Sequence, residues 1–409
     1  MSEEKRIVSA VIAGVGGYGG MITGDVLDHL NDYRVRVAGV VDPFYAASPQ
    51  KERLDALGIP HYDTLEEFYA ADQAELAILC TPIQYHEAHA ACAMAHGSDV
   101  LIEKPAAATP AQAKRMMEMA GRCGKTVNVG FQLSYMSAIL RLKEDILSGR
   151  FGAPKDCWSL VLWPRNSAYY ARSWAGRFTL NGQYVLDSIA MNACAHHLHI
   201  LYFLLGSRMD SAAMPEREKV LLMRVNDIET FDTAMMEIEA GGATLHYLVS
   251  HAVPDTTAPI LKLHFEKADI LIQGEGTEED AVTAVLPDGS RIHYGDLTKE
   301  YFRKVPYTLD VVRGLVAPVC TIETAMAQLL SVSAATFEAP VLDLRANLGK
   351  DSAAPRVYVK NDVRVADGLS ELMKRAYDEE KMPWMLTDNY GAPQEIALAG
   401  YLSPDERPL

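Results

Sequence analysis

The order of apolar runs and helical segments in the first third of the chain constrains its fold more than any other sequence feature. Short runs rich in β-branched residues alternate with helical segments, and the runs lie at 7–13, 35–41, 76–80, 100–102 and 127–131. Strands that are apolar throughout and are separated by helices are typical of parallel sheets covered on both faces. We therefore expect an α/β fold with a doubly wound parallel sheet over residues 1–128.

A glycine-rich loop follows the first of these expected strands. Gly14, Gly16 and Gly19 form a G-x-G-x-x-G pattern between a strand and a helix, where the motif can hold the pyrophosphate of a dinucleotide. Gly14 permits a tight turn, Gly16 lets the backbone approach the pyrophosphate, and Gly19 lets the helix pack closely on the strand. The pattern predicts a Rossmann domain that binds NAD or NADP, and we include Tyr18 in its cofactor site.

An acidic residue at the end of the second expected strand favours NAD. Asp42 stands 23 residues after Gly19, where a carboxylate can accept both ribose hydroxyls and would repel a 2′-phosphate. NADP stays open, because Pro43 could turn the Asp42 side chain aside and Arg53 could reach a phosphate.

The pattern changes after about residue 150, where strand-like alternation replaces continuous apolar runs. Two alternating segments joined by Gly241-Gly242 predict a β-hairpin, and the apolar segment 184–205 predicts a long helix. We expect residues 129–345 to form an α+β domain with a large, mostly antiparallel sheet. Residues 346–409 mix short apolar pieces with Pro and Gly, and we expect an extension that packs on the other domains.

Charge and cysteine usage exclude several classes of partner. The chain has 38 Lys and Arg against 54 Asp and Glu, a net charge of −16, which disfavours nucleic acids and anionic membranes. No apolar stretch approaches the roughly 18 residues of a membrane span. Six scattered cysteines without a C-x-x-C pair predict reduced thiols, and the N-terminus lacks an apolar signal, so we expect a cytoplasmic protein. His86, His89, Cys92 and His96 have helical ligand spacing but no convergent acid, so we expect no metal.

Three further short motifs follow along the chain: CTPIQYH at 80–86, EKP at 103–105 and VGFQLSY at 129–135. With the glycine loop, they make residues 6–345 resemble the Gfo/Idh/MocA family of NAD(P)-dependent oxidoreductases. The resemblance implies a Rossmann domain followed by an α/β domain whose open sheet carries the substrate site and often the oligomer interface. We therefore expect a homo-oligomer, a dimer or a tetramer.

The resemblance also assigns cofactor residues beyond the glycine loop, and these are Thr81, Pro82, His86, Glu103 and Lys104. Ligands of open parallel sheets bind outside the carboxyl ends of the strands, and Thr81 and Lys104 each follow an expected strand closely. The alternatives are that Lys104 is a solvated surface lysine and that His86 is an ordinary residue at a helix start.

The resemblance assigns acid–base work to an Asp-x-x-x-His pair on the first helix of the second domain. Counting back from Gly206 places the histidine at His196 and replaces the aspartate by Asn192. Asparagine can orient a partner but cannot hold a negative charge. The other registration uses Asp187, but Met191 then stands where the histidine should be. A structural role for His196 is the competing interpretation.

The substrate site is expected to combine aromatic, arginine and histidine side chains. Aromatic rings stack on sugar faces, and arginine can hold a carboxylate bidentately. The residues that we assign to it are Gln132, Tyr135, Tyr170, Arg172, Trp174, Arg177, His197 and His199, with Arg165 as a further candidate for a carboxylate.

Together these features predict reversible hydride transfer between NAD and a secondary hydroxyl of a sugar, inositol or sugar acid. His196 would act as the general base, Lys104 would stabilise the developing alkoxide, and Asn192 would orient the substrate or the imidazole. Two alternatives are NAD-assisted hydrolysis or elimination without net redox change, and a non-catalytic NAD-binding regulatory protein.

Overall fold

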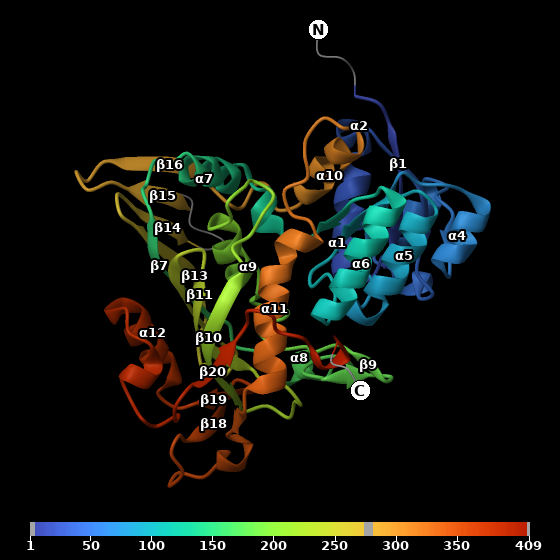
Figure 1. The fold of residues 1–409 in the computed structure, drawn as a ribbon. Coiled ribbons are helices and arrows are strands. Elements are labelled where there is room, and N and C mark those ends of the chain that lie inside the picture. The colour runs from blue at the N-terminus through green and yellow to red at the C-terminus, as the bar shows by residue number, and fades with distance from the viewer. Residues whose placement is uncertain (1–4, 274–280, 407–409) are drawn as a thin grey trace. The chain divides into compact units, whose positions relative to one another are not determined.

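The computed structural model describes residues 5–273 and 281–406. Residues 1–4 belong to the N-terminal segment in which we found no apolar export signal, and they lie outside the described residues. The chain forms two compact units (Figure 1). Unit 1 contains Met1–Tyr135 and Glu300–Ala325, and unit 2 contains Met136–Lys299 and Met326–Leu409. No described helix is long and apolar enough to cross a membrane.

Unit 1 is built on a six-stranded sheet in which every pairing is parallel. Its strands are β1 (Val8–Ala13), β2 (Val35–Val41), β3 (His61–Tyr62), β4 (Leu76–Leu79), β5 (Asp99–Ile102) and β6 (Val127–Val129). The order β3-β2-β1-β4-β5-β6 is the Rossmann order, so the predicted doubly wound sheet is confirmed.

Up to residue 123, the helices of unit 1 alternate with its strands, as the sequence pattern predicts, and one further helix comes from residues 304–312. They are α1 (Gly17–Asp28), α2 (Leu30–Tyr33), α3 (Lys51–Ala56), α4 (Leu65–Ala71), α5 (His86–Ala95), α6 (Pro110–Cys123) and α10 (Lys304–Val312). Thr109 caps α6 and forms a capping box with Gln112. Val305 and Leu309 of α10 join the core that includes Ile12 of β1. A segment remote in sequence therefore completes unit 1.

Unit 2 is built on a ten-stranded mixed sheet. Its strands are β7 (Pro154–Leu162), β10 (Pro215–Arg224), β11 (Thr233–Ala240), β12 (Ala243–Ser250), β13 (Thr257–Phe265), β14 (Asp269–Gln273), β15 (Val282–Val285), β16 (Arg291–Gly295), β17 (Val341–Asp343) and β20 (Gln394–Ala397). Seven of the pairings are antiparallel, and β7–β12 and β10–β17 are parallel. Gly241 and Gly242 both have positive φ in the turn between β11 and β12, which confirms the predicted hairpin.

The two faces of this sheet carry different layers. Trp158 of β7 and Leu248 of β12 pack with the C-terminal segment that contains β18 (Val357–Lys360), β19 (Val363–Ala366) and α12 (Leu369–Glu379). Adjacent residues of a strand point to opposite faces, and Tyr247 of β12 donates a hydrogen bond to the carbonyl of Cys194, 2.9 Å away, just before α9. The second face is covered by α7 (Ser137–Leu147), α9 (Ala195–Leu204) and α11 (Ile322–Glu338).

The predicted helix over 184–205 is wrong in its first half. After the short strands β8 (Thr179–Leu180) and β9 (Gln183–Tyr184), residues 185–188 are irregular, residues 189–194 form turns, and α9 begins at Ala195. Two polar side chains explain the break. Asp187 accepts hydrogen bonds from the Gly176 amide and the Asn192 side chain, and Ser188 Oγ accepts one from the Met191 amide. Such local hydrogen bonds compete with a helix for backbone groups.

Candidate active site

The glycine loop of unit 1 can be built only with glycine at two of its positions. Gly14 has a φ of +82°, and a Cβ there would lie 2.7 Å from the carbonyl oxygen of Cys80 at the end of β4. A Cβ on Gly19 would lie 1.9 Å from the carbonyl oxygen of Gly14. The two glycines therefore hold β1, β4 and α1 closer together than side chains allow.

Gly16 meets a different constraint. It is exposed and caps α1, and apart from its two chain neighbours no described residue has an atom within 4 Å of the position a Cβ would take on it. Open space beside a backbone that precedes free helix amides is what a pyrophosphate needs. The loop therefore fits the diphosphate of a dinucleotide.

The carboxylate of Asp42 points at this loop. Its Oδ2 accepts a hydrogen bond from the Val15 amide at 2.9 Å, and its Oδ1 accepts one from the Phe44 amide at 2.8 Å. Pro43 therefore does not turn the carboxylate away from the loop. Arg53, the residue that could favour NADP, donates to Asp28 at 2.7 Å. These contacts favour a ribose with free hydroxyls.

The EKP motif follows β5, and its Lys104–Pro105 peptide is cis. Lys104 is partly exposed, whereas Glu103 is buried. The buried ammonium of Lys304, from α10, pairs with Glu103 and donates to the hydroxyl of Tyr18 at 3.0 Å. Lys304 thus links the glycine loop to the EKP loop. Sequence reasoning missed it, because no motif surrounds it and its partners lie far away in the chain.

His86 ties two loops together at the carboxyl ends of the strands. One ring nitrogen lies 2.7 Å from the carbonyl oxygen of Thr81, and the other lies 3.0 Å from that of Pro105. Burial lowers the pKa of His86, and in its neutral form the ring donates to only one of these two carbonyls. His89 contacts the Thr81 hydroxyl and His96 contacts the Cys92 carbonyl, so these side chains do not converge on one point.

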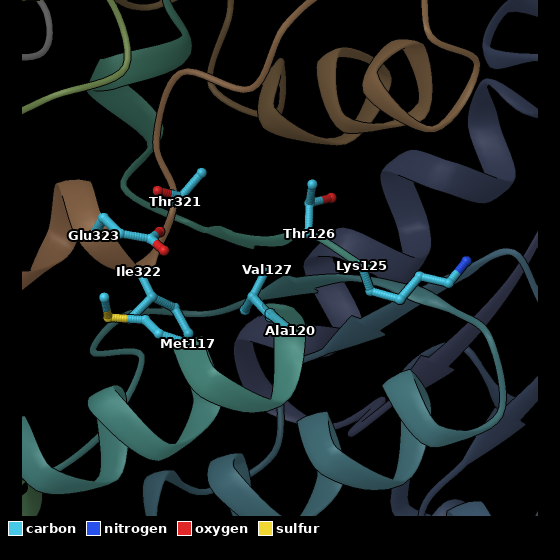
Figure 2. Close-up of a pocket in the computed structure, with 8 residues that line it drawn as sticks. All are labelled: Met117, Ala120, Lys125, Thr126, Val127, Thr321, Ile322 and Glu323. Carbon is cyan, nitrogen blue, oxygen red and sulfur yellow. The ribbon is translucent and has the colours of Figure 1, made fainter. Parts of the chain in front are cut away.

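A small cavity of about 150 Å³ lies elsewhere in unit 1 (Figure 2). The residues that line it are Met117, Ala120, Lys125, Thr126, Val127, Thr321, Ile322 and Glu323. None of them was assigned to a cofactor or substrate site from the sequence. The cavity lies where α11 begins beside β6, and its lining mixes apolar side chains with Lys125 and Glu323 (Figure 2).

In unit 2, Asn192 and His196 do not share a helix as expected. Asn192 lies in the turn before α9, whereas His196 lies in the first turn of α9 and is partly exposed. The side-chain amide of Asn192 donates to Asp187 at 3.0 Å. Asp187 was the alternative candidate for the aspartate of the Asp-x-x-x-His pair. In the structure it lies next to Asn192.

Two of the other assigned histidines are packing residues. His197 is buried edge-on against the ring of Trp163, 5.3 Å between ring centroids. His199 has no exposed surface, and burial, together with the charge of Lys143, lowers its pKa to about 3. Both are therefore poor candidates for a substrate contact.

Three other residues that we assigned to the substrate site are buried or paired within the protein. The fully buried hydroxyl of Tyr135 donates to the carbonyl of Val129 at 2.9 Å, and it also reaches the carbonyl of Cys320. Gln132, three residues before it, is also buried. Arg177 forms an ion pair with Glu229 at 2.8 Å.

The segment after β7 carries the remaining assigned residues. It contains α8 (Ser167–Tyr170), and its aromatic side chains pack in edge-to-face pairs, Tyr169 with both Tyr170 and Trp174. Arg172 lies over the rings of Tyr169 and Trp174. A cavity of about 580 Å³ borders this segment.

Comparison with known proteins identifies relatives of unit 1 above all. Residues 8–131 match the model of the Gfo/Idh/MocA oxidoreductase family, described as having an NAD-binding Rossmann fold. Inositol 2-dehydrogenase of Burkholderia cenocepacia (strain HI2424) is 32% identical over 185 residues, 45% of this chain and 50% of that protein. D-glucoside 3-dehydrogenase of Escherichia coli (strain K12) is 29% identical over 91 residues, 22% and 26% of the two chains. The chain spans half or less of the length of the curated relatives it matches.

Solved structures extend the likeness to most of the chain. The WlbA dehydrogenase of Bordetella pertussis, in complex with NADH and UDP-GlcNAcA, has a TM-score of 0.65 at 21% identity and covers 80% of this chain and 95% of its own. An NAD-binding oxidoreductase of Klebsiella pneumoniae has a TM-score of 0.66 at 19% identity, with coverage of 80% and 95%. At these identities the likeness concerns the fold.

Proposed function

We propose that the chain is an NAD-dependent dehydrogenase of the Gfo/Idh/MocA oxidoreductase family, whose model residues 8–131 match. Its reaction moves a hydride between the nicotinamide and a secondary hydroxyl of a sugar, inositol or sugar acid. The open cradle beside Gly16, between strand and helix, is the single observation that carries the proposal. The contacts of Asp42 support NAD over NADP. The relatives named inositol 2-dehydrogenase and D-glucoside 3-dehydrogenase support the class of substrate.

The proposed mechanism divides the work between three side chains. NAD, when bound, would supply the group that accepts or donates the hydride. Lys104 donates a hydrogen bond to the substrate oxygen and stabilises the negative charge that develops there. His196 takes the hydroxyl proton, a step for which a pKa near neutrality is suited. Asn192, held by Asp187, orients the substrate or the imidazole.

The test is turnover with NAD and a panel of polyols, namely myo-inositol, methyl glucosides and aldonic acids. We expect NADH absorbance with at least one of them. Replacing a general base costs about 10²–10⁴-fold in rate, so His196→Ala should lower kcat by that order. Lys104→Ala should also lower kcat. Lys51→Ala, which removes an exposed lysine paired with Asp55, is the matched control and should leave the rate unchanged.

The same assay separates the competing functions. Consumption of a substrate without net NADH would replace the proposal with NAD-assisted hydrolysis or elimination. NAD binding without turnover of any panel member would favour a regulatory protein. Failure to bind NAD in calorimetry, with a folded chain, would overturn all three.

A further inference from the structure

Two arginines beside the cavity of about 580 Å³ in unit 2 have no acidic partner among the described residues. Within residues 5–273 and 281–406, no carboxylate forms an ion pair with Arg165 or Arg172, and the one hydrogen bond of their guanidinium groups runs from Arg165 to the carbonyl of Pro164. Arg177, on the same segment, pairs with Glu229, and Arg364 pairs with Asp227. In a chain of net charge −16, acids to pair with are abundant, so two neighbouring arginines without one mark a place where an external anion can bind.

Both guanidinium groups lie over the same aromatic ring, that of Tyr169. The Cζ atoms of Arg165 and Arg172 lie 5.3 and 4.9 Å from the centroid of the Tyr169 ring. Each also lies over a tryptophan, Arg165 over Trp163 at 5.8 Å and Arg172 over Trp174 at 5.5 Å. Stacking occupies the flat face of a guanidinium and leaves its N–H edge available for a bidentate hydrogen bond to an oxyanion.

The cavity beside these arginines is walled by the C-terminal segment. Its lining includes Arg165, Tyr169 and Arg172 on one side and Asn361 and Val363 on the other, and its volume is about 580 Å³. That volume falls within the 300–1,000 Å³ or so of small-molecule sites.

The hairpin that forms the second wall is anchored. Asn361 and Asp362 both have positive φ, at 50° and 63°, as the tight turn between β18 and β19 requires. Asp362 accepts a hydrogen bond from the Ser167 amide at 3.1 Å, and Lys360 pairs with Asp255 at 3.0 Å. The turn is therefore fastened to the segment that carries the arginines.

The acids near Tyr169 form their hydrogen bonds with groups other than Arg165 and Arg172. The carboxylate of Asp187 is held by the Gly176 amide and the Asn192 side chain, and that of Asp362 is held by Ser167. His251, whose ring centroid lies 5.7 Å from that of Tyr169, is buried. Burial and the charge of Arg165 lower its pKa to about 3, so it is neutral.

We infer that Arg165 and Arg172 form an oxyanion subsite, and that the physiological substrate is a polyol or sugar bearing a carboxylate or a phosphate. This inference rests on the proposed function, because it names the chemical class of that substrate. The paired guanidinium edges hold the oxyanion, the ring of Tyr169 keeps them in place, and the turn at Asn361 limits the size of the group that enters.

Binding of matched probes to the full chain tests the inference without requiring turnover. Calorimetry compares methyl β-D-glucuronide and glucose 6-phosphate with the neutral methyl β-D-glucoside. Charge-assisted hydrogen bonds are each worth about 1.5–3 kcal/mol, and 1.4 kcal/mol corresponds to tenfold. At least one anionic probe should therefore bind at least about tenfold more tightly than the neutral one. The probe that shows the preference identifies the anion as carboxylate or phosphate.

Variants decide whether the arginines are responsible. Arg165→Gln and Arg172→Gln should each reduce the preference, and the double variant should abolish it. Tyr169→Phe should keep the preference because the ring remains, and Arg208→Gln, at an exposed arginine paired with Asp210, should keep it too. An unchanged melting temperature establishes that the variants fold. Equal binding of all three probes by the wild type, or a preference that survives in the double variant, would overturn the inference. Both results are independent of whether NADH is ever formed, so they separate this inference from the proposed function.

Discussion

In unit 1, the side chain of Lys304 connects two loops that are far apart in the sequence. Its ammonium has no exposed surface and pairs with Glu103, the acid next to Lys104. It also donates to Tyr18 of the glycine loop. A charge so deeply buried is stable only while its partner is present. Lys304 is therefore a positioning residue for the two loops that we assign to the cofactor.

We expect Lys304→Met to destabilise the chain strongly, because it leaves Glu103 buried without a counter-charge. Breaking one half of a buried pair costs about 3–5 kcal/mol, measured as the free energy of unfolding in urea. The double variant Lys304→Met, Glu103→Gln should regain part of that loss, because the stranded charge is gone. Lys51→Met, which breaks the exposed ion pair with Asp55, should lower the free energy of unfolding much less. A double variant no more stable than Lys304→Met would contradict the role of the ion pair.

At the scale of elements, unit 2 is joined by a buried polar chain that runs from the sheet into two helices. Glu218 of β10 accepts a hydrogen bond from Ser331 of α11 at 2.8 Å, and Ser331 shares a hydrogen bond with Tyr202 of α9 at 2.6 Å. Burial raises the pKa of Glu218 to about 8. The side chain is therefore mostly protonated at neutral pH and acts as an uncharged link between sheet and helices.

This raised pKa gives the stability of the chain a pH dependence of known sign. The folded pKa of Glu218 lies above its unfolded value, so the folded chain binds the extra proton between about pH 4.5 and about pH 8. Protonated Glu218 contributes to the free energy of unfolding. This contribution is fully present below that pH window and is lost as the pH rises through it. Glu218→Gln should flatten this part of the profile of melting temperature against pH. An identical slope in the variant would show that other groups cause it.

At the scale of the whole molecule, the last residues of the chain cover one face of the sheet in unit 2. Met373 and Tyr377 of α12 pack in one core with Trp158 and Leu248 of the sheet. Lys262 of β13 forms an ion pair with Glu380, at the end of α12, at 2.7 Å. We expected a homo-oligomer because an open sheet offers a surface for a second copy of the chain. In unit 2, α12 covers part of that sheet surface.

We expect Met373→Asp to loosen α12 and expose apolar sheet surface, because an unpaired charge is costly in that core. Large exposed apolar patches promote association. The variant should therefore show a larger mass than the wild type by size-exclusion chromatography with light scattering. Lys374→Asp changes the exposed neighbouring residue of α12 and should leave the mass unchanged. A folded Met373→Asp variant of wild-type mass would show that α12 does not shield the sheet.

Sequence reasoning reached the sheet of unit 1 and the glycine loop because their signals are local. The apolar strands, the spacing of Gly14, Gly16 and Gly19, and the cap at Thr109 each depend on a few consecutive residues. The same reasoning extended a helix back to residue 184, since it counted apolar residues and could not include the hydrogen bonds that Asp187 and Ser188 make in the folded chain.

The amino-acid order alone thus determined the parallel sheet of unit 1, and it predicted the resemblance of residues 8–131 to their family, because periodicity and short motifs act within a few residues. Only the tertiary structure decided which charges are paired. It placed Lys304 on Glu103, 201 positions away, and paired Arg177 with an acid, whereas Arg165 and Arg172 have no acidic partner in the part of the chain that the structure describes. Partners of this kind are chosen by packing between distant segments, and no local pattern encodes that choice.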